Sequence, residues 1–561
     1  MVRASLADGI NDIGEEFQTI FGDIVIGEGS KEDTWYKSNP SEYYKNTFND
    51  NTKPSARSNT GANSLIKIYD FSEIDSRMSL RIAFGSDKVN QISTADISSP
   101  LDDVKWINTV SGQVNKILMF ADNTGFLTSD YQLQNLNKIE AEIDFAPASF
   151  EFNNAAGYIF SYNNQISYYS FNNSVRTLRT FTDSVKITTP PVISKVGEKV
   201  EFMLGNESGF INVYEILPDV SGTINNYKLF SAFSDAVKQV AVSDDNVAAI
   251  GSSAYWDNKY GKIEFASEPK KLLMTKYEND FSSVILLSDN TIEVIKKGAI
   301  TASINIDQPV KDISFADLKA DGSNYIIVNT GSTIDSYNLA GGKADNFPVE
   351  ISGDSEFVGC PLAVDLNTDN YDDVVAFASD GRMFAYSGKS GEILQPFPLS
   401  IGNSPVTDAL LFNNSNQTNL LVVGSDLTAN LWQLFDTELA INWASKFGTG
   451  LNSASIPGAS SENVVTTFFP KSKAYNWPNP VYDDETYFRF YVAEDAKVEI
   501  NIFDLAGDMV TKLNKNVQGG YDNEITWNVS GIQSGVYFAH LNIEGTTGKS
   551  DYKIIKVAVI K

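Results

Sequence analysis

The sequence predicts a mainly β protein, in which a β-propeller of seven or eight blades is followed by a small β-sandwich. Short apolar strands and turns rich in Asp, Asn and Gly recur between residues 86 and 470. Residues 471–561 form a second region, whose strands alternate apolar and polar side chains. Alternation with a period of two is typical of a sheet that has one buried and one solvated face. Residues 1–85 do not repeat, and we predict that they form a separate N-terminal region.

The composition is that of a globular protein with several domains. The chain has 561 residues, of which 42% are hydrophobic and 12% aromatic, so it can build more than one packed core. Its net charge is −28, which repels nucleic-acid phosphates and anionic lipid head groups. We therefore expect no nucleic-acid partner. We also expect no membrane-spanning helix, because the sequence has no run of about 18 apolar residues.

Residues 1–85 begin without the apolar core of a signal peptide. We expect either that a signal peptide has been removed or that the chain begins inside a longer precursor. The region carries, in order, ADGIND (Ala7–Asp12), Gly22–Asp23, a tryptophan after acidic residues (Trp35), and PSARSNTG (Pro54–Gly61) before an I-x-I-x strand. These motifs resemble the stretch that follows the catalytic core in M6-family metallopeptidases, the relatives of immune inhibitor A.

The zinc site of that peptidase family is missing here. The family binds its metal on H-E-x-x-H, in which two imidazoles one helical turn apart hold the zinc and the Glu acts as base. This chain has one histidine, His540, and one cysteine, Cys360, which we expect to be a buried and inert thiol in the apolar stretch VGCPLAV. No G-x-S-x-G nucleophile signature is present either. We therefore predict no catalytic residues.

The middle region, residues 86–470, repeats one theme with a period of roughly 45 residues, which is the period of a propeller blade. A β-solenoid is the alternative that hydrophobic periodicity allows, but its repeats are shorter. An alternating strand that follows a turn marks each unit. These strands are predicted at Gln165–Phe171, Phe210–Ile216, Thr291–Ile295, Thr333–Leu339, Arg382–Gly388 and Thr428–Leu434.

One loop of this region has the spacing of a calcium ligand set. Within VDLNTDNYDDVVAF (Val364–Phe377), oxygen donors stand at positions one, three, five and nine, with a backbone carbonyl at position seven. The predicted ligands are Asp365, Asn367, Asp369, the carbonyl of Tyr371, and Asp373. Ca²⁺ takes about six to eight oxygen ligands, so the pattern suits a structural Ca²⁺ ion. The alternative is a plain turn rich in Asp and Asn.

This loop resembles the calcium loops of FG-GAP-type propeller repeats. Those repeats carry Gly at the sixth position, where this chain has Asn370, a residue that tolerates a left-handed backbone. The preceding unit, Phe315–Val328, keeps Asp317, Asp321 and Gly322, but Lys319 replaces an oxygen ligand. We expect no metal in that second loop, because Lys319 would bring a positive charge into it.

The last region, residues 471–561, combines NWPNP, VEINIFDL, a Gly-rich turn, GVYFAHL and KIIK in that order. The pattern resembles the C-terminal sorting domain of proteins exported by the type IX secretion system, and the immunoglobulin-like domain of the flagellar hook-cap protein. The resemblance implies an immunoglobulin-like sandwich, an extracytoplasmic location and contact with the secretion machinery. Val557–Lys561 continues beyond the strand at which that family usually stops. We expect Trp527 and Phe538 in its core, and Ser455–Val465 as the preceding linker.

These observations favour a binding function. The leading hypothesis is a non-catalytic scaffold of an extracytoplasmic assembly, which binds a protein or a glycan through loops on a propeller face, such as Ala254–Gly261. The alternative is the ancillary, substrate-engaging region of a secreted M6-like peptidase whose zinc domain is absent from this chain. A third hypothesis is a propeller lyase or glycosidase that uses carboxylates in its central channel.

Overall fold

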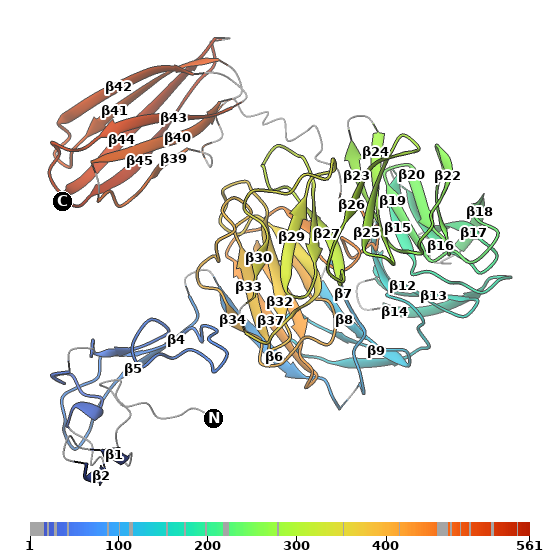
Figure 1. Ribbon diagram of the computed structural model, residues 1–561, viewed down its shortest axis with the longest axis horizontal. Coiled ribbons are helices and arrows are strands. Elements are labelled where there is room, and N and C mark those ends of the chain that lie inside the picture. Colours follow the sequence, from blue (N-terminus) through green and yellow to red (C-terminus); the bar gives the residue numbers. More distant parts are fainter. Residues whose placement is uncertain are drawn as a thin grey trace. The chain divides into compact units, whose positions relative to one another are not determined.

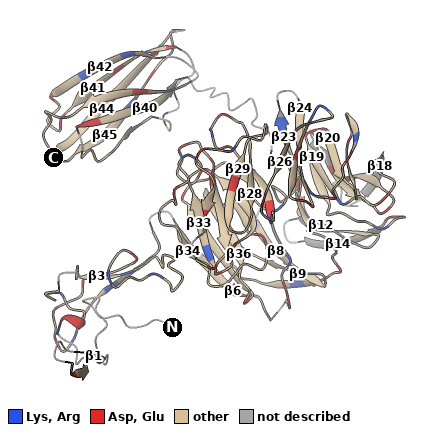
Figure 2. Ribbon diagram, viewed as in Figure 1, with Lys and Arg blue, Asp and Glu red and all other residues tan. Residues whose placement is uncertain are grey.

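The computed structural model describes residues 16–18, 22–26, 31–41, 44–456 and 469–561 (Figure 1). Short gaps lie at 87–88, 100, 112–115, 153–154, 173–174, 197–198, 217–223, 278–279, 352, 415, 470, 472–473, 483, 493–494, 518–520 and 547. The chain divides into two compact units, Met1–Gly458 and Ala459–Lys561. The described residues are nearly all β, with a single short 3-10 helix, η1 (Lys31–Asp33). Figure 2 shows acidic residues distributed over both units.

The N-terminal region contains two small sheets and an aromatic cluster. Its strands are β1 (Glu16–Gln18) and β2 (Ile24–Ile26), then β3 (Thr47–Phe48), β4 (Ile66–Tyr69) and β5 (Arg81–Phe84). The ring of Trp35 lies 5.2 to 5.6 Å from the rings of Tyr44, Phe48 and Phe71. The predicted I-x-I-x strand is therefore confirmed as β4, whereas the Ala7–Asp12 motif lies outside the described residues.

Four antiparallel sheets of four consecutive strands follow. They consist of β7 (Trp106–Ser111), β8 (Lys116–Ala121), β9 (Gly125–Ser129) and β10 (Asn137–Glu140); β11 (Ala148–Phe152), β12 (Ala155–Tyr162), β13 (Gln165–Asn172) and β14 (Val175–Thr182); β15 (Val192–Val196), β16 (Lys199–Gly205), β17 (Phe210–Ile216) and β18 (Ile224–Ser231); and β19 (Gln239–Ser243), β20 (Asn246–Ile250), β21 (Ala254–Asp257) and β22 (Gly261–Glu264). Each strand pairs with the next one along the chain.

Four further sheets complete this part of the chain. They consist of β23 (Pro269–Tyr277), β24 (Asp280–Leu287), β25 (Thr291–Lys296) and β26 (Ala299–Asn305); β27 (Asp312–Ala316), β28 (Tyr325–Asn329), β29 (Thr333–Tyr337) and β30 (Val349–Glu350); β31 (Phe357–Val364), β32 (Asp373–Ala378), β33 (Arg382–Tyr386) and β34 (Leu399–Ser400), joined by β38 (Ile441–Trp443); and β35 (Leu410–Asn414), β36 (Gln417–Val423) and β37 (Thr428–Phe435), joined by β6 (Asn90–Asp96). All six strands predicted in this region are confirmed: they are the third strands of their sheets, β13, β17, β25, β29, β33 and β37.

Two kinds of contact hold these eight sheets together. The first strands β7, β11, β15, β19 and β23 contact one another in chain order, β27 contacts β31, and β35 contacts β7. The early strand β6 pairs with β37 at the other end of the array, with Thr94 opposite Asn430. Because β6 precedes β7 in the chain, this pairing joins the beginning of the array to its end.

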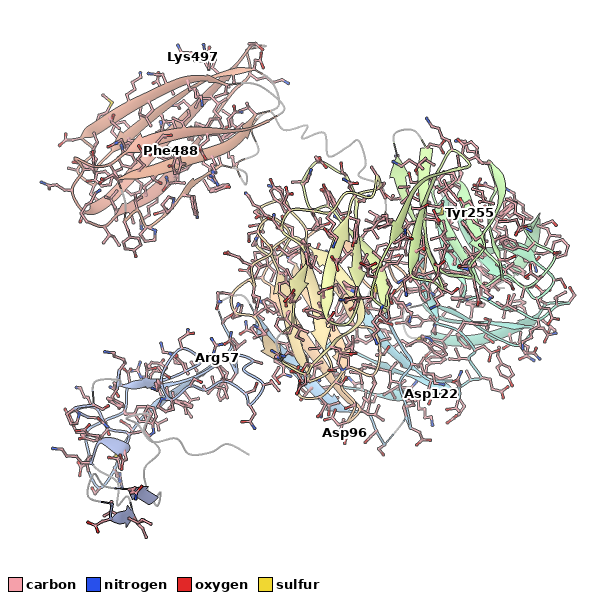
Figure 3. All side chains as sticks on the ribbon, viewed as in Figure 1. Arg57, Asp96, Asp122, Tyr255, Phe488 and Lys497 are labelled. Atoms are coloured by element: carbon pink, nitrogen blue, oxygen red, sulfur yellow. The ribbon has the colours of Figure 1, made fainter. Side chains whose placement is uncertain are left out.

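One predicted loop of this array is wrong in part. Residues Ala254–Gly261 were expected to be a loop that contacts a partner, but Ala254–Asp257 forms β21 and only residues 258–260 form an exposed turn. Tyr255 is fully buried, and its hydroxyl lies 2.9 Å from the Ser283 hydroxyl on β24 of the next sheet (Figure 3). The segment AYWD carries two large aromatic side chains because it packs between sheets, so Tyr255 is not available to a partner.

The second unit consists of two sheets that enclose one core. One sheet has the order β39 (Tyr475–Trp477), β40 (Glu485–Val492) and β43 (Tyr521–Asn528). The other has the order β42 (Met509–Val517), β41 (Ala496–Phe503), β44 (Gly535–Gly545) and β45 (Ser550–Val559). Trp527 and Phe488 are stacked in this core, with ring centroids 6.2 Å apart. Phe488 is labelled in Figure 3. The prediction that Trp527 is a core residue is confirmed.

The prediction for Phe538 is wrong, since its side chain is 37% exposed. Tyr537, Ala539 and Leu541 point into the core, so the alternation of β44 places Phe538 on the outer face of the sheet.

The last residues of the sequence belong to the sandwich. Val557 and Val559 are buried, and the amide of Val481 donates a hydrogen bond to the carbonyl of Ala558 at 2.7 Å. The residues after KIIK therefore extend β45.

Candidate functional site

The predicted calcium loop connects β31 to β32 and folds around its own carboxylates. Asp365 accepts hydrogen bonds from the amides of Asp369 at 3.0 Å and Asn370 at 2.8 Å. Asp373 accepts them from the amides of Leu366 at 2.8 Å and Asn367 at 3.2 Å. Asn370 has a φ of 72°, so it adopts the left-handed conformation expected at the sixth position. The backbone thus holds the first and ninth residues of the predicted ligand set inside the loop.

The carboxylates of this loop are buried close to one another. Asp373 has no exposed surface, and burial, reinforced by the negative charge of Asp369, raises the pKa of its carboxyl to about 8. Burial and the charge of Asp369 also raise the pKa of Asp365 to about 6. In both carboxyls the raised pKa reflects a less favourable charged form, because burial excludes water and neighbouring carboxylates repel it. The loop concentrates negative charge that a bound cation would neutralise.

The neighbouring loop, between β27 and β28, has the same frame. Asp317 accepts hydrogen bonds from the amides of Gly322 at 2.8 Å and Lys319 at 3.1 Å. The side chain of Lys319 extends over the ring of Tyr325, with its Nζ 5.8 Å from the centroid. Lys319 therefore occupies the position of an oxygen ligand without placing an oxygen there, as the sequence indicates.

Asp372 connects the two loops. Its carboxylate accepts hydrogen bonds from the amide of Asp317 and from the side-chain amide of Asn442, both at 2.6 Å. Its own amide donates to the carbonyl of Asp317 at 2.9 Å. Burial raises the pKa of Asp372 to about 7 despite these hydrogen bonds. No role for Asp372 is evident from the sequence, although the residue directly precedes Asp373, a predicted ligand.

The donor types of the first loop suit a hard cation such as Ca²⁺, but its side chains are not arranged around one point. Asn367 and Asp369 use side-chain oxygens to accept the amides of Asp369 and Tyr371, each at 3.0 Å. Across the part of the chain that the structure describes, no group of three or more acidic, histidine or cysteine side chains is placed to hold a metal ion. Calcium binding through Asp365, Asn367, Asp369, Tyr371 and Asp373 stays a prediction.

The one cysteine and the one histidine of the chain belong to different compact units. Cys360 is 2% exposed on β31, and burial raises the pKa of its thiol to about 12, although the charge of Lys271 opposes this. A thiol with so high a pKa is a poor nucleophile at neutral pH. His540 lies on the outer face of β44, where its ring contacts that of Tyr552 at 5.1 Å.

A buried ion pair beside Cys360 was not predicted. Lys271 on β23 forms a salt bridge with Asp312 on β27, and its Nζ also donates to the carbonyl of Ile313 at 2.9 Å. Its Nζ lies 3.7 Å from Cys360 Sγ. The pair joins the first strands of two consecutive sheets. The only trace of this ion pair in the sequence is the position of Lys271 near the start of the first strand of its sheet. Lysines also directly precede the first strands of three other sheets, at Lys105, Lys238 and Lys311.

Comparison with known proteins identifies the C-terminal part. Residues 476–557 match the secretion system C-terminal sorting domain family. No match was found among curated proteins. Among solved structures, BBS1N in complex with ARL6DN aligns with 12% identity and a TM-score of 0.39, over 62% of this chain and 98% of that one. The extracellular domain of a B. thetaiotaomicron protein assigned to the one-component systems aligns with 12% identity and a TM-score of 0.36, over 89% of this chain and 62% of that one.

The sorting-domain match places the protein outside the cytoplasm, as a secreted or cell-surface protein. It also implies contact with the secretion machinery through residues 476–557. No helix among the described residues is long and apolar enough to cross a membrane.

Proposed function

We propose that the protein is a secreted, non-catalytic binding protein, in which the eight sheets form a β-propeller that docks a protein or glycan partner. The immunoglobulin-like sandwich directs export or attachment. The main support for a propeller is the pairing of β6 with β37, because a strand from the beginning of the array completes its last sheet. Propeller closure of this kind leaves blade-connecting loops on two broad faces, and such loops commonly bind partners.

Contacts along the array support the same architecture. The first strands of consecutive sheets contact one another, and Lys271 and Asp312 join two of them through a buried ion pair. Each sheet has three or four strands of its own, which is the composition of a propeller blade. Eight sheets correspond to the upper of the two predicted blade numbers.

The acidic loops support calcium as a structural ion in this propeller. Asp365, Asp369 and Asp373 interact electrostatically within one loop, and Asp372 links that loop to the next sheet. A cation there would stabilise the junction of two sheets and would supply no reactive partner. The ion would act on stability and leave the chain without catalytic chemistry.

The experiment that tests the binding function is purification from the native source under mild conditions, followed by mass spectrometry of co-eluting molecules. A partner at a fixed ratio to the chain supports the proposal. A chain that elutes alone, both from the medium and from the cell surface, contradicts it.

The ancillary-region hypothesis has one observation in its favour. The N-terminal region exposes apolar side chains that a further protein part would cover: Phe84 is 75% exposed, Ile24 68% and Ile82 52%. The discriminating observation is the coding sequence upstream of Met1. An open reading frame that continues into H-E-x-x-H favours the peptidase-associated role, and a signal peptide directly before Val2 favours the scaffold.

A further inference from the structure

The segment that begins with β38 and continues to Ile456 crosses the first strands of the array. We call residues 441–456 the crossing segment. Its carbonyls accept hydrogen bonds from amides of successive first strands. The donors and acceptors are Leu411 to Ala444 at 2.8 Å, Ser149 to Gly450 at 2.7 Å, Ile193 to Leu451 at 2.9 Å, Val242 to Ser453 at 2.9 Å and Met274 to Ala454 at 2.8 Å. The segment therefore contacts β35, β11, β15, β19 and β23 in turn. The crossing segment thus joins five sheets of the array through backbone hydrogen bonds.

A cavity of about 280 Å³ lies beside this segment. Its walls come from residues at the starts of first strands, including Lys105 and Trp106 at β7, Asp144 before β11 and Lys238 before β19. The crossing segment itself lines the cavity with residues from Ser445 to Asn452. One cavity is thus lined from several sheets at once, as a ligand site at the axis of a propeller would be.

Lysine recurs at equivalent positions of these walls. The amides of Lys105, Lys238 and Lys311 donate to Ala121, Ile250 and Asn329 at 2.9, 2.8 and 2.7 Å, and each acceptor ends or nearly ends a neighbouring strand of the same sheet. Lys105 and Lys238 line the 280 Å³ cavity, where Lys446 of the crossing segment joins them. Lys311 and Lys446 line a second cavity of about 220 Å³, which shares Thr407 and Asp408 with the first. Four exposed lysines thus contribute to the lining of these two cavities, in a chain whose net charge is −28.

The partners of these lysines leave their charge accessible. Lys446 lies 3.3 Å from Asp408, and 49% of its side chain is exposed. Lys238 pairs with Glu268, with 36% and 54% of the two side chains exposed. The Lys105 ammonium donates to the neutral amide oxygen of Asn123. Asp408 is only 19% exposed, so its pair with Lys446 is partly buried. The pair of Lys238 with Glu268 is exposed, and exposed pairs are weak and exchange partners readily, so Lys238 can engage an anion.

The remaining lining groups suit hydroxyl groups and an apolar ring face. Asp144 and Asp408 carry carboxylates that accept hydrogen bonds, and Trp106 and Phe447 offer partly buried aromatic surface. A volume of about 280 Å³ accommodates one sugar-sized group. We propose that the cavity binds a small hydroxylated anion, either a sugar acid or a sugar phosphate, through Lys105, Lys238 and Lys446. This assignment deepens the proposed binding function and rests on it.

The test is calorimetric titration of the full chain with glucuronate, glucose 6-phosphate and glucose at one ionic strength. We expect at least one anion to bind and glucose to bind at least tenfold more weakly. Lys446→Met and Lys105→Met should each weaken the anion about tenfold, whereas Lys389→Met, a surface lysine 4.9 Å from the Tyr371 ring centroid, should leave it unchanged. The two anions distinguish a carboxylate from a phosphate ligand.

Two results would overturn the assignment. The first is that neither anion gives heat with a chain whose thermal unfolding is that of a folded protein. The second is that Lys446→Met binds the anion as tightly as the unaltered chain does. In either case, retention of a co-purifying macromolecular partner would leave the proposed binding function standing while removing this ligand site. If the unaltered chain purifies without a macromolecular partner, the proposed function itself is contradicted.

Discussion

The acidic loop between β31 and β32 should make the stability of the folded chain fall as pH rises, and calcium should oppose that fall. The pKa of Asp373 is raised from 3.8 to about 8 in the folded chain. Between these values the folded state holds more protons than the unfolded state, so stability falls as pH rises from about 4 to 8. At pH 7 the carboxyl lies roughly three pH units above its ordinary pKa, and each unit corresponds to about 1.4 kcal/mol. The expected loss between pH 4 and pH 7 is therefore of the order of 4 kcal/mol.

Calorimetric unfolding of the full chain with EDTA or with Ca²⁺ measures this effect. With EDTA, the transition of the first unit should occur at a lower temperature at pH 8 than at pH 5. Ca²⁺ at a hundredfold excess over its Kd adds about 2.7 kcal/mol and should raise the transition mainly at pH 8. Asp369→Ala should abolish the calcium effect, and Asp321→Ala in the neighbouring loop should preserve it. If EDTA changes nothing at pH 8, or if Asp369→Ala still responds to Ca²⁺, the loop is only a turn.

Three further predictions concern packing and chemistry. Trp527→Ala should destabilise the second unit by about 3 to 5 kcal/mol, because the side chain is buried in its core. Phe538→Ala, at a position that is 37% exposed, should cost about 1 kcal/mol. Equal losses of stability in denaturant unfolding would contradict the faces assigned to the two residues. Gly450→Val should destabilise the first unit by about 1 to 3 kcal/mol, because a Cβ there would lie 2.6 Å from Ser149 Oγ, and Gly531→Ala, which meets nothing within 4 Å, is the matched control. If Gly450→Val unfolds like the unaltered chain, the crossing segment is not packed as described. The pure chain should not cleave casein in the presence of zinc, and cleavage that survives His540→Ala would refute the absence of catalysis.

Strands with clear periodicity could be predicted from the sequence. Val498, Ile500 and Ile502 point into the core of the second unit, as their alternation indicates. The strand ending at Phe435 is also where the repeat predicted it. Local pattern suffices for such elements because the period of a half-buried strand is set by its own backbone.

Elements that depend on distant contacts could not be predicted. The crossing segment has no periodic pattern, since its hydrogen bonds go to strands far away in the sequence, and its last residues were assigned to a linker starting at Ser455. The ion pair of Lys271 and Asp312 could not be predicted from the sequence either, because each residue resembles an ordinary surface charge. The aromatic character of Phe538 favours burial, but the alternation that Tyr537 and Ala539 define places it on the outer face.

The candidate site was predicted in part. The first and ninth residues of the acidic loop, Asp365 and Asp373, were identified from spacing, and the structure places both inside one loop. The role of Asp372 depends on a hydrogen bond to Asp317 in another sheet, which spacing within one loop cannot reveal.

The most direct test of the central claim compares the full chain with residues 1–458, the first compact unit, in a bacterium with the native secretion system. Both chains are located by cell fractionation, and their co-purifying molecules are identified by mass spectrometry. We predict that the full chain reaches the cell surface or medium with a partner at a fixed ratio. Residues 1–458 should remain inside the cell but bind the same partner when it is added to the purified unit. A partner that binds only through residues 459–561 would contradict the account.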